Sequence, residues 1–172
     1  SGSIFGKGTT TVSCSVSDAS GNTSPCSFTV TVMDTEAPIV APLPNISANT
    51  APGQCSTQVA FPLPGVSDNC PGVGAPVCIP PSGSTFSKGT TTVTCSVLDA
   101  AGNVSSSSFT VTVNDAESPW ISCYTDITLN SCTTNTPVDL NYFVPFGDNC
   151  PGATLQCNPP SGSIFASGTV PV

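Results

Sequence analysis

The sequence predicts an all-β protein built from tandem antiparallel β-sandwiches, and three observations support this fold class. Apolar and hydroxyl side chains alternate with a period of two, turn-forming Asp, Asn and Gly residues recur at fixed places, and the whole pattern repeats after about 80 residues. Short strands separated by such turns are typical of a two-layer antiparallel sandwich.

Two pairs of equivalent segments have the composition of strands. Phe-Thr-Val-Thr-Val occurs at 28–32 and again at 109–113, so that the apolar residues face one way and the threonines the other. Segments 9–16 and 90–97 are rich in Thr and Val, which suit a pleated, half-buried surface. We therefore expect the same two strands in both copies of the repeat.

Two kinds of turn separate the expected strands. Asp-Ala-x-Gly-Asn occurs at 18–22 and 99–103, and Asp-Asn-Cys-Pro-Gly occurs at 68–72 and 148–152. Asp and Asn side chains can close a turn through hydrogen bonds to the backbone, and Gly adopts positive φ without strain. Both motifs therefore predict tight connections at the ends of the sandwich.

The phase of the repeat predicts one complete unit flanked by two partial ones. Residues 1–34 correspond to the C-terminal half of a unit, 35–115 to a complete unit, and 116–172 to the N-terminal part of a third. A half sandwich cannot bury its own core and leaves a strand edge open. We expect the third unit to be completed by residues 1–34 of the next chain or by sequence outside this stretch.

The composition excludes several classes of function. The 172 residues include 2 Lys and Arg, 10 Asp and Glu and no His, which gives a net charge of −8. Such a chain is a poor partner for nucleic acid or anionic membrane, and it lacks the His of the common hydrolase triads and zinc sites. No apolar run is long enough to span a bilayer. The 10 cysteines indicate an extracellular, oxidising environment.

The repeated motifs together resemble the hyalin repeat (HYR) domain family. They are Pro-Pro-Ser-Gly-Ser-x-Phe followed by Gly-Thr-Thr-Thr-Val-x-Cys, then Asp-Ala-x-Gly-Asn, then Ser-Phe-Thr-Val-Thr-Val, and they cover nearly the whole chain. The resemblance implies disulfide-rich immunoglobulin-like sandwiches in extracellular, often tandem, adhesion or matrix proteins, without catalytic residues. The third unit departs from the pattern at 166–172, where Pro171 interrupts an expected strand.

Comparison of the units suggests the disulfide pairing inside the chain. The four cysteines of the complete unit allow three pairings. Cys55 and Cys70 correspond to Cys132 and Cys150 of the third unit, so we expect Cys55–Cys70 and Cys132–Cys150. The remaining pair of the complete unit is then Cys78–Cys95.

Four further cysteines have complementary positions in the two partial units. Cys157 corresponds to Cys78 and Cys14 to Cys95, while Cys123 and Cys26 align with Pro42 and Ser107. One hypothesis is that Cys157–Cys14 and Cys123–Cys26 join copies head to tail, a contact that does not close and so forms a filament. The alternative is that the chain belongs to a longer array, in which these cysteines pair with residues outside it.

Glycans and calcium are the candidate non-protein components, and no cofactor is required. The sequons at Asn22, Asn45 and Asn103 are candidate N-glycan sites, the Ser- and Thr-rich segments could carry O-glycans, and Asn22 and Asn103 equally fit a structural role in their turn. Acidic residues recur in register near the unit junctions and turns, where calcium would find oxygen ligands. These candidates are Asp34, Glu36, Asp68, Asp99, Asp115, Glu117 and Asp148. The competing interpretation is that they cap turns and keep the surface soluble.

These observations favour a non-enzymatic structural or adhesive module of an extracellular filament or stalk, whose main partners are copies of itself. Other matrix or cell-surface proteins are possible partners. The alternative function is a tandem adhesion region of a larger secreted protein that binds a receptor or carbohydrate through loops at the sandwich end. A third interpretation is an accessory region of a secreted enzyme.

Overall fold

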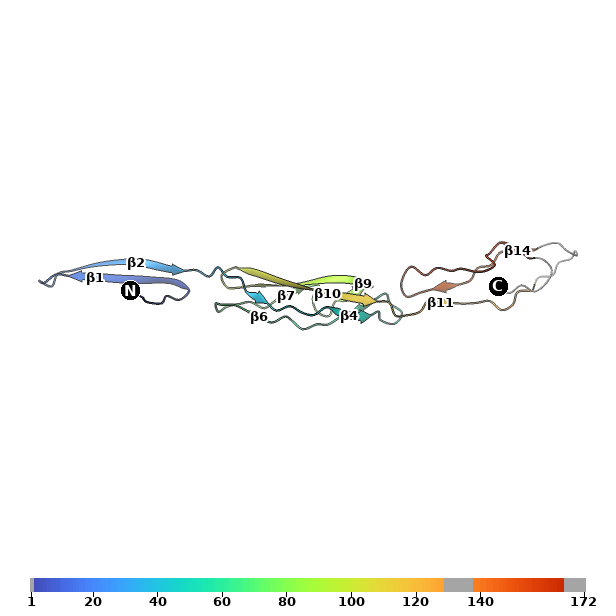
Figure 1. Ribbon diagram of the computed structural model, residues 1–172, viewed down its shortest axis with the longest axis horizontal. Coiled ribbons are helices and arrows are strands. Elements are labelled where there is room, and N and C mark those ends of the chain that lie inside the picture. Colours follow the sequence, from blue (N-terminus) through green and yellow to red (C-terminus); the bar gives the residue numbers. More distant parts are fainter. Residues whose placement is uncertain (1, 129–137, 166–172) are drawn as a thin grey trace. The chain divides into compact units, whose positions relative to one another are not determined.

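The computed structural model describes residues 2–128 and 138–165, and throughout these residues the only regular elements are strands. The prediction of an all-β, disulfide-containing fold with antiparallel strand pairs is confirmed (Figure 1). The strands of the N-terminal part and complete repeat are β1 (Gly8–Ser17), β2 (Thr23–Val32), β3 (Ile39–Val40), β4 (Ile46–Asn49), β5 (Ser56–Gln58), β6 (Val66–Ser67), β7 (Val77–Ile79), β8 (Thr85–Ser87), β9 (Gly89–Leu98) and β10 (Val104–Asn114). The last four are β11 (Trp120–Ile121), β12 (Val138–Leu140), β13 (Phe146–Gly147) and β14 (Ser163–Phe165).

The complete repeat is built on a four-stranded sheet in the order β4-β10-β9-β7, with two smaller pairs, β3-β6 and β5-β8. The period-2 pattern has the expected consequence, because alternate residues of β9 and β10 are buried and the threonines between them lie outside. The buried apolar side chains of this repeat are Val40, Val59, Phe61, Cys78, Phe86, Val93, Cys95, Val97, Phe109, Val111 and Val113. The rings of Phe61 and Phe109 meet edge to face, with centroids 5.0 Å apart.

The first serine of the Ser-Gly-Ser motif hydrogen-bonds to an earlier backbone segment in both the complete repeat and the third unit. Ser82 Oγ accepts a hydrogen bond from Phe61 N at 2.8 Å and donates one to Phe61 O at 2.7 Å. In the third unit Ser161 Oγ accepts from Tyr142 N at 2.9 Å. In both units the first serine of the motif therefore accepts a hydrogen bond from a backbone N–H that precedes the Asp-Asn-Cys turn.

The N-terminal strands form a hairpin whose apolar face is open. β1 and β2 pair with each other from Gly8↔Val32 to Ser17↔Thr23 and belong to a two-stranded sheet (Figure 1). Val16 is 68% and Phe28 54% exposed, whereas their counterparts Val97 and Phe109 are 3% and 4% exposed. The same residue types, Val and Phe, stand at these positions in both hairpins, so the difference in exposure arises from what packs against each hairpin.

Among the described residues of the third unit, the strands form only the smaller pairs. β11 pairs with β13 and β12 with β14, which are the equivalents of β3-β6 and β5-β8. Residues 156–158, the counterparts of β7, contain no strand, and neither do 127 and 128, the described part of the region equivalent to β4. In the complete repeat, β4 and β7 are the edge strands that flank β10 and β9.

Trp120 replaces the Ile39 of the complete repeat and lies against a smaller neighbour. Ile39 is opposite Ser67, whereas Trp120 is opposite Gly147. A Cβ atom on Gly147 would lie 2.9 Å from the indole ring. The loss of a side chain at 147 thus makes room for the indole, which remains 57% exposed and is not a core residue.

The chain divides into two compact units, one of residues 1–46, 60–84 and 91–111, the other of residues 47–59, 85–90 and 112–172. Each disulfide and each junction contact described below lies within one of these units. Among the described residues there is no helix that is long and apolar enough to cross a membrane.

Candidate functional site at the repeat junctions

The junction between the complete repeat and the third unit is closed by a disulfide. Cys55 is bonded to Cys150, 95 residues further along the chain. The expected pairings Cys55–Cys70 and Cys132–Cys150 are therefore wrong. An alignment of the units cannot distinguish a disulfide within one repeat from a disulfide between neighbouring repeats. Either arrangement needs a cysteine at the same two positions of each unit. The second disulfide joins Cys78 on β7 to Cys95 on β9, two residues directly opposite in the sheet.

The other cysteines of the described residues are free thiols. They include Cys70, which was expected to form a disulfide within the chain, and the four of the complementary set, Cys14, Cys26, Cys123 and Cys157. Cys132 lies outside the described residues. Burial and the neighbouring Asp34 carboxylate raise the pKa of the half-buried Cys70 thiol.

The loop from Thr50 to Cys55 holds the next repeat by polar contacts beside the disulfide. Asn149 Nδ2 donates to Gln54 O at 2.9 Å, and Gly53 N donates to Glu117 Oε2 at 2.8 Å. Both partners come from motifs that occur in the complete repeat and again in the third unit, namely the Asp-Asn-Cys turn and the acidic junction. The disulfide and these two bonds together define a junction site.

A lysine–aspartate ion pair recurs at both junctions. Lys7 Nζ lies 3.0 Å from Asp34 Oδ2, and Lys88 Nζ lies 3.1 Å from Asp115 Oδ2. The hydrogen bond and charge of Lys7 lower the pKa of Asp34, and Lys88 does the same for Asp115. Sequence reasoning missed these pairs, although the equal spacing of 27 residues in both repeats was the available signal.

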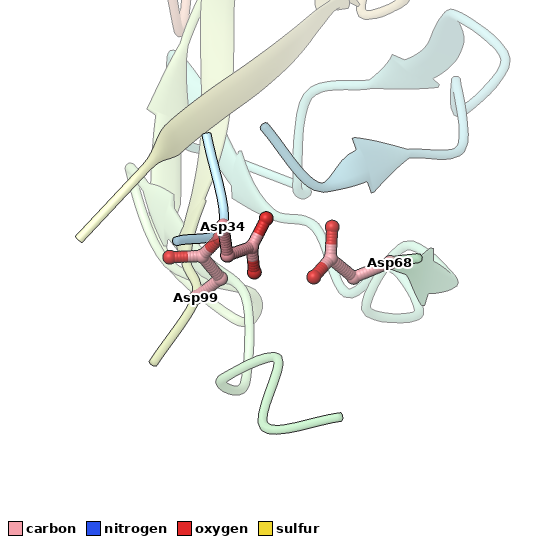
Figure 2. A group of neighbouring side chains, drawn as sticks. All are labelled: Asp34, Asp68 and Asp99. Carbon is pink, nitrogen blue, oxygen red and sulfur yellow. The ribbon is translucent and has the colours of Figure 1, made fainter. Parts of the chain in front are cut away.

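Three of the candidate calcium ligands come together at the first junction. One oxygen each of Asp34, Asp68 and Asp99 lies within 4.8 Å of the others, and Figure 2 shows the three side chains approaching from separate segments. Lys7 already pairs with Asp34, and Asp99 accepts hydrogen bonds from its own turn. Asp68 Oδ1 is buried and accepts no hydrogen bond from the described residues. Calcium needs six to eight oxygens, so its binding here stays a prediction.

The other four candidate calcium ligands interact with groups of this chain. Among the described residues they do not belong to a cluster of three or more potential metal ligands. Glu36 accepts from Asn69 Nδ2 at 2.9 Å, Glu117 from Gly53 N, and Asp115 from Lys88. Asp148 Oδ1 accepts from Asn149 N at 2.8 Å, as a turn cap does. These contacts fit the interpretation of the acidic residues as junction and turn elements.

The Asp-Ala-x-Gly-Asn turn is closed in the same way in both copies. Asp99 Oδ1 accepts from Ala101 N and Asn103 N at 2.8 Å, and Asp99 Oδ2 accepts from Asn103 Nδ2 at 2.8 Å. Asp18 makes the equivalent bonds with Ser20 and Asn22. The Asn of the motif is therefore used by the turn, whatever else it carries.

These contacts predict unequal glycan occupancy at the three sequons. Asn103 Nδ2 donates to both Asp99 Oδ2 and Asp34 O, so that a sugar on this nitrogen would break a bond, whereas Asn22 has only the first kind of contact. Asn45 is exposed and uses its Oδ1 to accept from Thr110 N. In a glycosylating host, peptide mapping should find occupancy highest at Asn45 and lowest at Asn103. Full occupancy of Asn103 would contradict this order.

Acid should destabilise the fold below about pH 4, because its key carboxylates ionise more easily in the folded state. Burial opposes ionisation of Asp99, but hydrogen bonds from Asn103 outweigh it and lower the pKa of Asp99; the side chain of Asn22 lowers the pKa of Asp18. A lowered carboxyl pKa contributes stability above the ordinary value near 3.8 and loses it as the pH falls further. The variant Asp99→Asn should show a weaker acid dependence than the wild type when thermal unfolding is measured against pH. Equal acid dependence in the two proteins would contradict the assignment.

The sandwich core, the repeated turns and the disulfide-linked junction define a tandem-repeat protein of disulfide-stabilised β-domains. The sequence profile of the HYR domain matches residues 1–32 and 33–113. The chain belongs to the HYR domain family.

Two proteins named hyalin are similar to most of the chain. Hyalin from Strongylocentrotus purpuratus is 33% identical over 179 aligned residues, which cover 99% of this chain and 15% of that protein. Hyalin from Lytechinus variegatus is 29% identical over 164 residues, which cover 90% of this chain and 30% of that protein. The chain thus spans a minor part of the length of these relatives. No solved structure matches significantly.

Proposed function

We propose that the chain is a non-enzymatic structural module of an extracellular assembly, in which β1 and β2 of one copy complete residues 116–165 of the preceding copy. The observation that carries this proposal is the open apolar face of the β1–β2 hairpin. Its counterpart β9–β10 has the same alternation and buries the same face against the complete repeat. An uncovered apolar face of this kind is typical of an interaction surface.

Residues 116–165 carry the partners that such a hairpin would need. In the complete repeat Thr110 N donates to Asn45 Oδ1 at 2.9 Å. The counterpart of Asn45 is Asp126, whose carboxylate can accept the same bond from Thr29 N of an incoming hairpin. Likewise, Cys157 and Cys14 are the counterparts of the bonded pair Cys78–Cys95.

The turn glycines support the same fit. A Cβ atom on Gly72 would lie 2.8 Å from Ala100 Cβ, so the Asp-Asn-Cys-Pro-Gly turn packs tightly on the turn between β9 and β10. A Cβ atom on Gly152, its counterpart, would meet no atom of the described residues within 4 Å other than those of its chain neighbours. The counterpart of Ala100 is Ala19, in the hairpin turn that the proposal brings to this position.

The register of β4 and β10 supports a second covalent link. Asn45 bonds Thr110, and Thr50 N donates to Asn114 O, so the two segments advance in the same direction. Three residues before the first of these contacts lie Pro42 and Ser107, the counterparts of Cys123 and Cys26. If the register continues by these three residues, Cys123 and Cys26 would come close to each other in the shared sandwich.

Repetition of this contact joins copies head to tail, because the two surfaces that meet are different and lie in different parts of the chain. Such copies form an open filament when the rotation between them does not close a ring. Disulfides across each contact would carry tension covalently, and they would persist only in an oxidising, extracellular environment. The recurring acidic residues have structural contacts in junctions and turns, which favours a mechanical role over catalysis.

The proposal can be tested by sedimentation of the full chain and of two variants. Each variant places a charge on one of the two faces of the hairpin. The wild type should form species that grow with concentration, and Phe28→Asp should remain monomeric because the charge would enter the shared core. Ser27→Asp is the matched control, since its counterpart Ser108 stays exposed in the complete repeat. A wild type that is monomeric at every concentration, or equal behaviour of the two variants, would refute strand sharing.

A further inference from the structure

We propose that Cys14 and Cys26 form a disulfide with each other in the unassembled chain, and that Cys157 of the preceding copy exchanges with this bond when copies join. The second step rests on the proposed function. Cys14 on β1 lies directly opposite Cys26 on β2, and both are exposed thiols. The hairpin therefore places two oxidisable groups next to each other on a surface that solvent reaches.

The two cysteine side chains lie on the same face of the hairpin. Side chains of directly opposite residues in an antiparallel pair project to one side of the sheet, and their Cα atoms are about 4.5–5.5 Å apart. Disulfides span Cα separations of about 4.4–6.8 Å, so this bond can form with little movement of the backbone. The face is the open apolar one, because Val16 and Phe28, each two residues further along its strand, are exposed on it.

The complete repeat contains a disulfide of the same kind. Cys78 on β7 and Cys95 on β9 are directly opposite in the sheet and bonded to each other. Opposite residues can thus be joined in this fold while the strands stay paired. The Cys14–Cys26 bond closes a loop that lies wholly within the hairpin, so it restrains β1 and β2 and leaves the core of the complete repeat unaffected.

The same position of the complete repeat has a neighbour on each side. Thr94 Oγ1 lies 3.1 Å from Ser108 Oγ, so these two residues are opposite each other in β9 and β10. The next pair along the strands is Cys95 and Ser107, and Cys78 lies on the other side of Cys95. Three positions therefore form a row across the sheet, with Cys95 in the middle.

In a sheet shared between copies, this row is made of three cysteines. They are the counterparts of Cys78, Cys95 and Ser107, namely Cys157, Cys14 and Cys26. In thiol–disulfide exchange a thiolate attacks one sulfur of a disulfide while the other sulfur leaves. Because Cys157 would lie on the side of Cys14 away from Cys26, the row puts the attacking, central and leaving sulfurs in line.

The exchange needs no external oxidant. The Cys157 thiol loses a proton, its thiolate bonds to Cys14 Sγ, the Cys14–Cys26 bond breaks, and Cys26 leaves as a thiolate that takes up a proton. The oxidation is the earlier formation of the Cys14–Cys26 bond, in which two thiols give two protons and two electrons to glutathione disulfide and reduce it to two thiols. The released Cys26 thiol can pair with Cys123 in a second oxidation of the same kind.

This order of events confines the covalent link to copies that have joined correctly. Bonded to each other, Cys14 and Cys26 offer no free thiol on the open face of an unassembled hairpin. The link between copies forms where the hairpin lies beside Cys157.

The first test is the disulfide in a dilute, monomeric chain. Full-length protein is refolded in a glutathione buffer, its remaining thiols are blocked, and the monomer band of a non-reducing gel is digested with endoproteinase Asp-N without reduction. Cleavage before Asp18 and Asp34 places Cys14 and Cys26 in separate peptides, 1–17 and 18–33. We expect these peptides as a linked pair that dithiothreitol separates.

The matched control is the double variant Cys26→Ser, Ser27→Cys. It leaves the composition of peptide 18–33 unchanged and moves the thiol by one residue to the other face of the hairpin. The linked pair should be absent from this variant.

The second test is the exchange itself. A chain with Cys123→Ser is purified as the bonded monomer, freed of glutathione and concentrated without oxygen. Copies should become linked from Cys14 to Cys157, and one Cys26 thiol should appear for each link. Adding Cys157→Ser should prevent the link and keep Cys14 bonded to Cys26.

The outcomes separate this inference from the proposed function. Cys14 and Cys26 recovered as separate blocked thiols from an oxidised monomer, or a linked pair in the control variant, would overturn the first step. Association without exchange, or exchange that survives Cys157→Ser, would overturn the second step. Each of these results leaves strand sharing standing. A chain that does not associate at any concentration would overturn the proposed function and the exchange with it, whereas the bond within the hairpin is decided by the first test alone.

Discussion

Phe109→Ala should lower the free energy of unfolding of the complete repeat by about 3–5 kcal/mol, the usual cost of removing a buried phenylalanine. Phe109 is 4% exposed, and its ring meets Phe61 edge to face. The cost combines the lost transfer of apolar surface with the cavity that remains, since a small sandwich core has few side chains able to close it. Chemical denaturation followed by circular dichroism measures the change.

Phe28→Ala is the matched control, because it makes the same change at the equivalent position of the hairpin. Phe28 is 54% exposed, so we expect the stability of a dilute chain to change by only about 0.5 kcal/mol. The same variant should weaken association strongly, since assembly would bury this ring as Phe109 is buried. Equal destabilisation by both substitutions in the dilute chain would contradict the open hairpin.

Loss of the junction disulfide should have the next largest effect. The double variant Cys55→Ser, Cys150→Ser should lose about 2–4 kcal/mol, because the bond closes a long loop and restricts the unfolded chain. Replacing both cysteines avoids leaving a reactive thiol. Denaturation under non-reducing conditions measures the loss, and hydrogen exchange should place it in residues 138–165 and in the loop before Cys55.

Cys14→Ser, Cys26→Ser is the control for this prediction. These two cysteines are exposed free thiols opposite each other in the hairpin, so their loss should leave the dilute chain's stability unchanged. A junction variant as stable as this control would mean that Cys55–Cys150 does not hold the two repeats together.

The local elements could be predicted from the sequence because each depends on few residues. The Phe-Thr-Val-Thr-Val segments form strands with the expected faces in β2 and β10, and the Asp-Ala-x-Gly-Asn turns close through the Asp and Asn side chains. Period-2 alternation and turn chemistry act over a few residues, so tertiary structure needed only to agree with them.

The junction could not be predicted in the same way, because it depends on which repeat meets which. Cys70 and Cys150 look the same in sequence, yet Cys150 is bonded to a cysteine of the preceding unit. Lys7 and Lys88 likewise resemble surface charges until the fold brings each to an aspartate 27 residues later. A repeating sequence fixes the positions of such groups within a unit and leaves the partner unit undetermined.

Isotope mixing tests strand sharing between copies most directly. Equal amounts of unlabelled and ¹⁵N-labelled chain would be unfolded and reduced together, refolded in a glutathione buffer, and digested without reduction. The account predicts a disulfide-linked peptide pair of Cys14 and Cys157, with about half of the pairs containing one labelled and one unlabelled partner. Pairs with both partners of one isotope only, or Cys14 and Cys157 recovered as free thiols from assembled material, would contradict it.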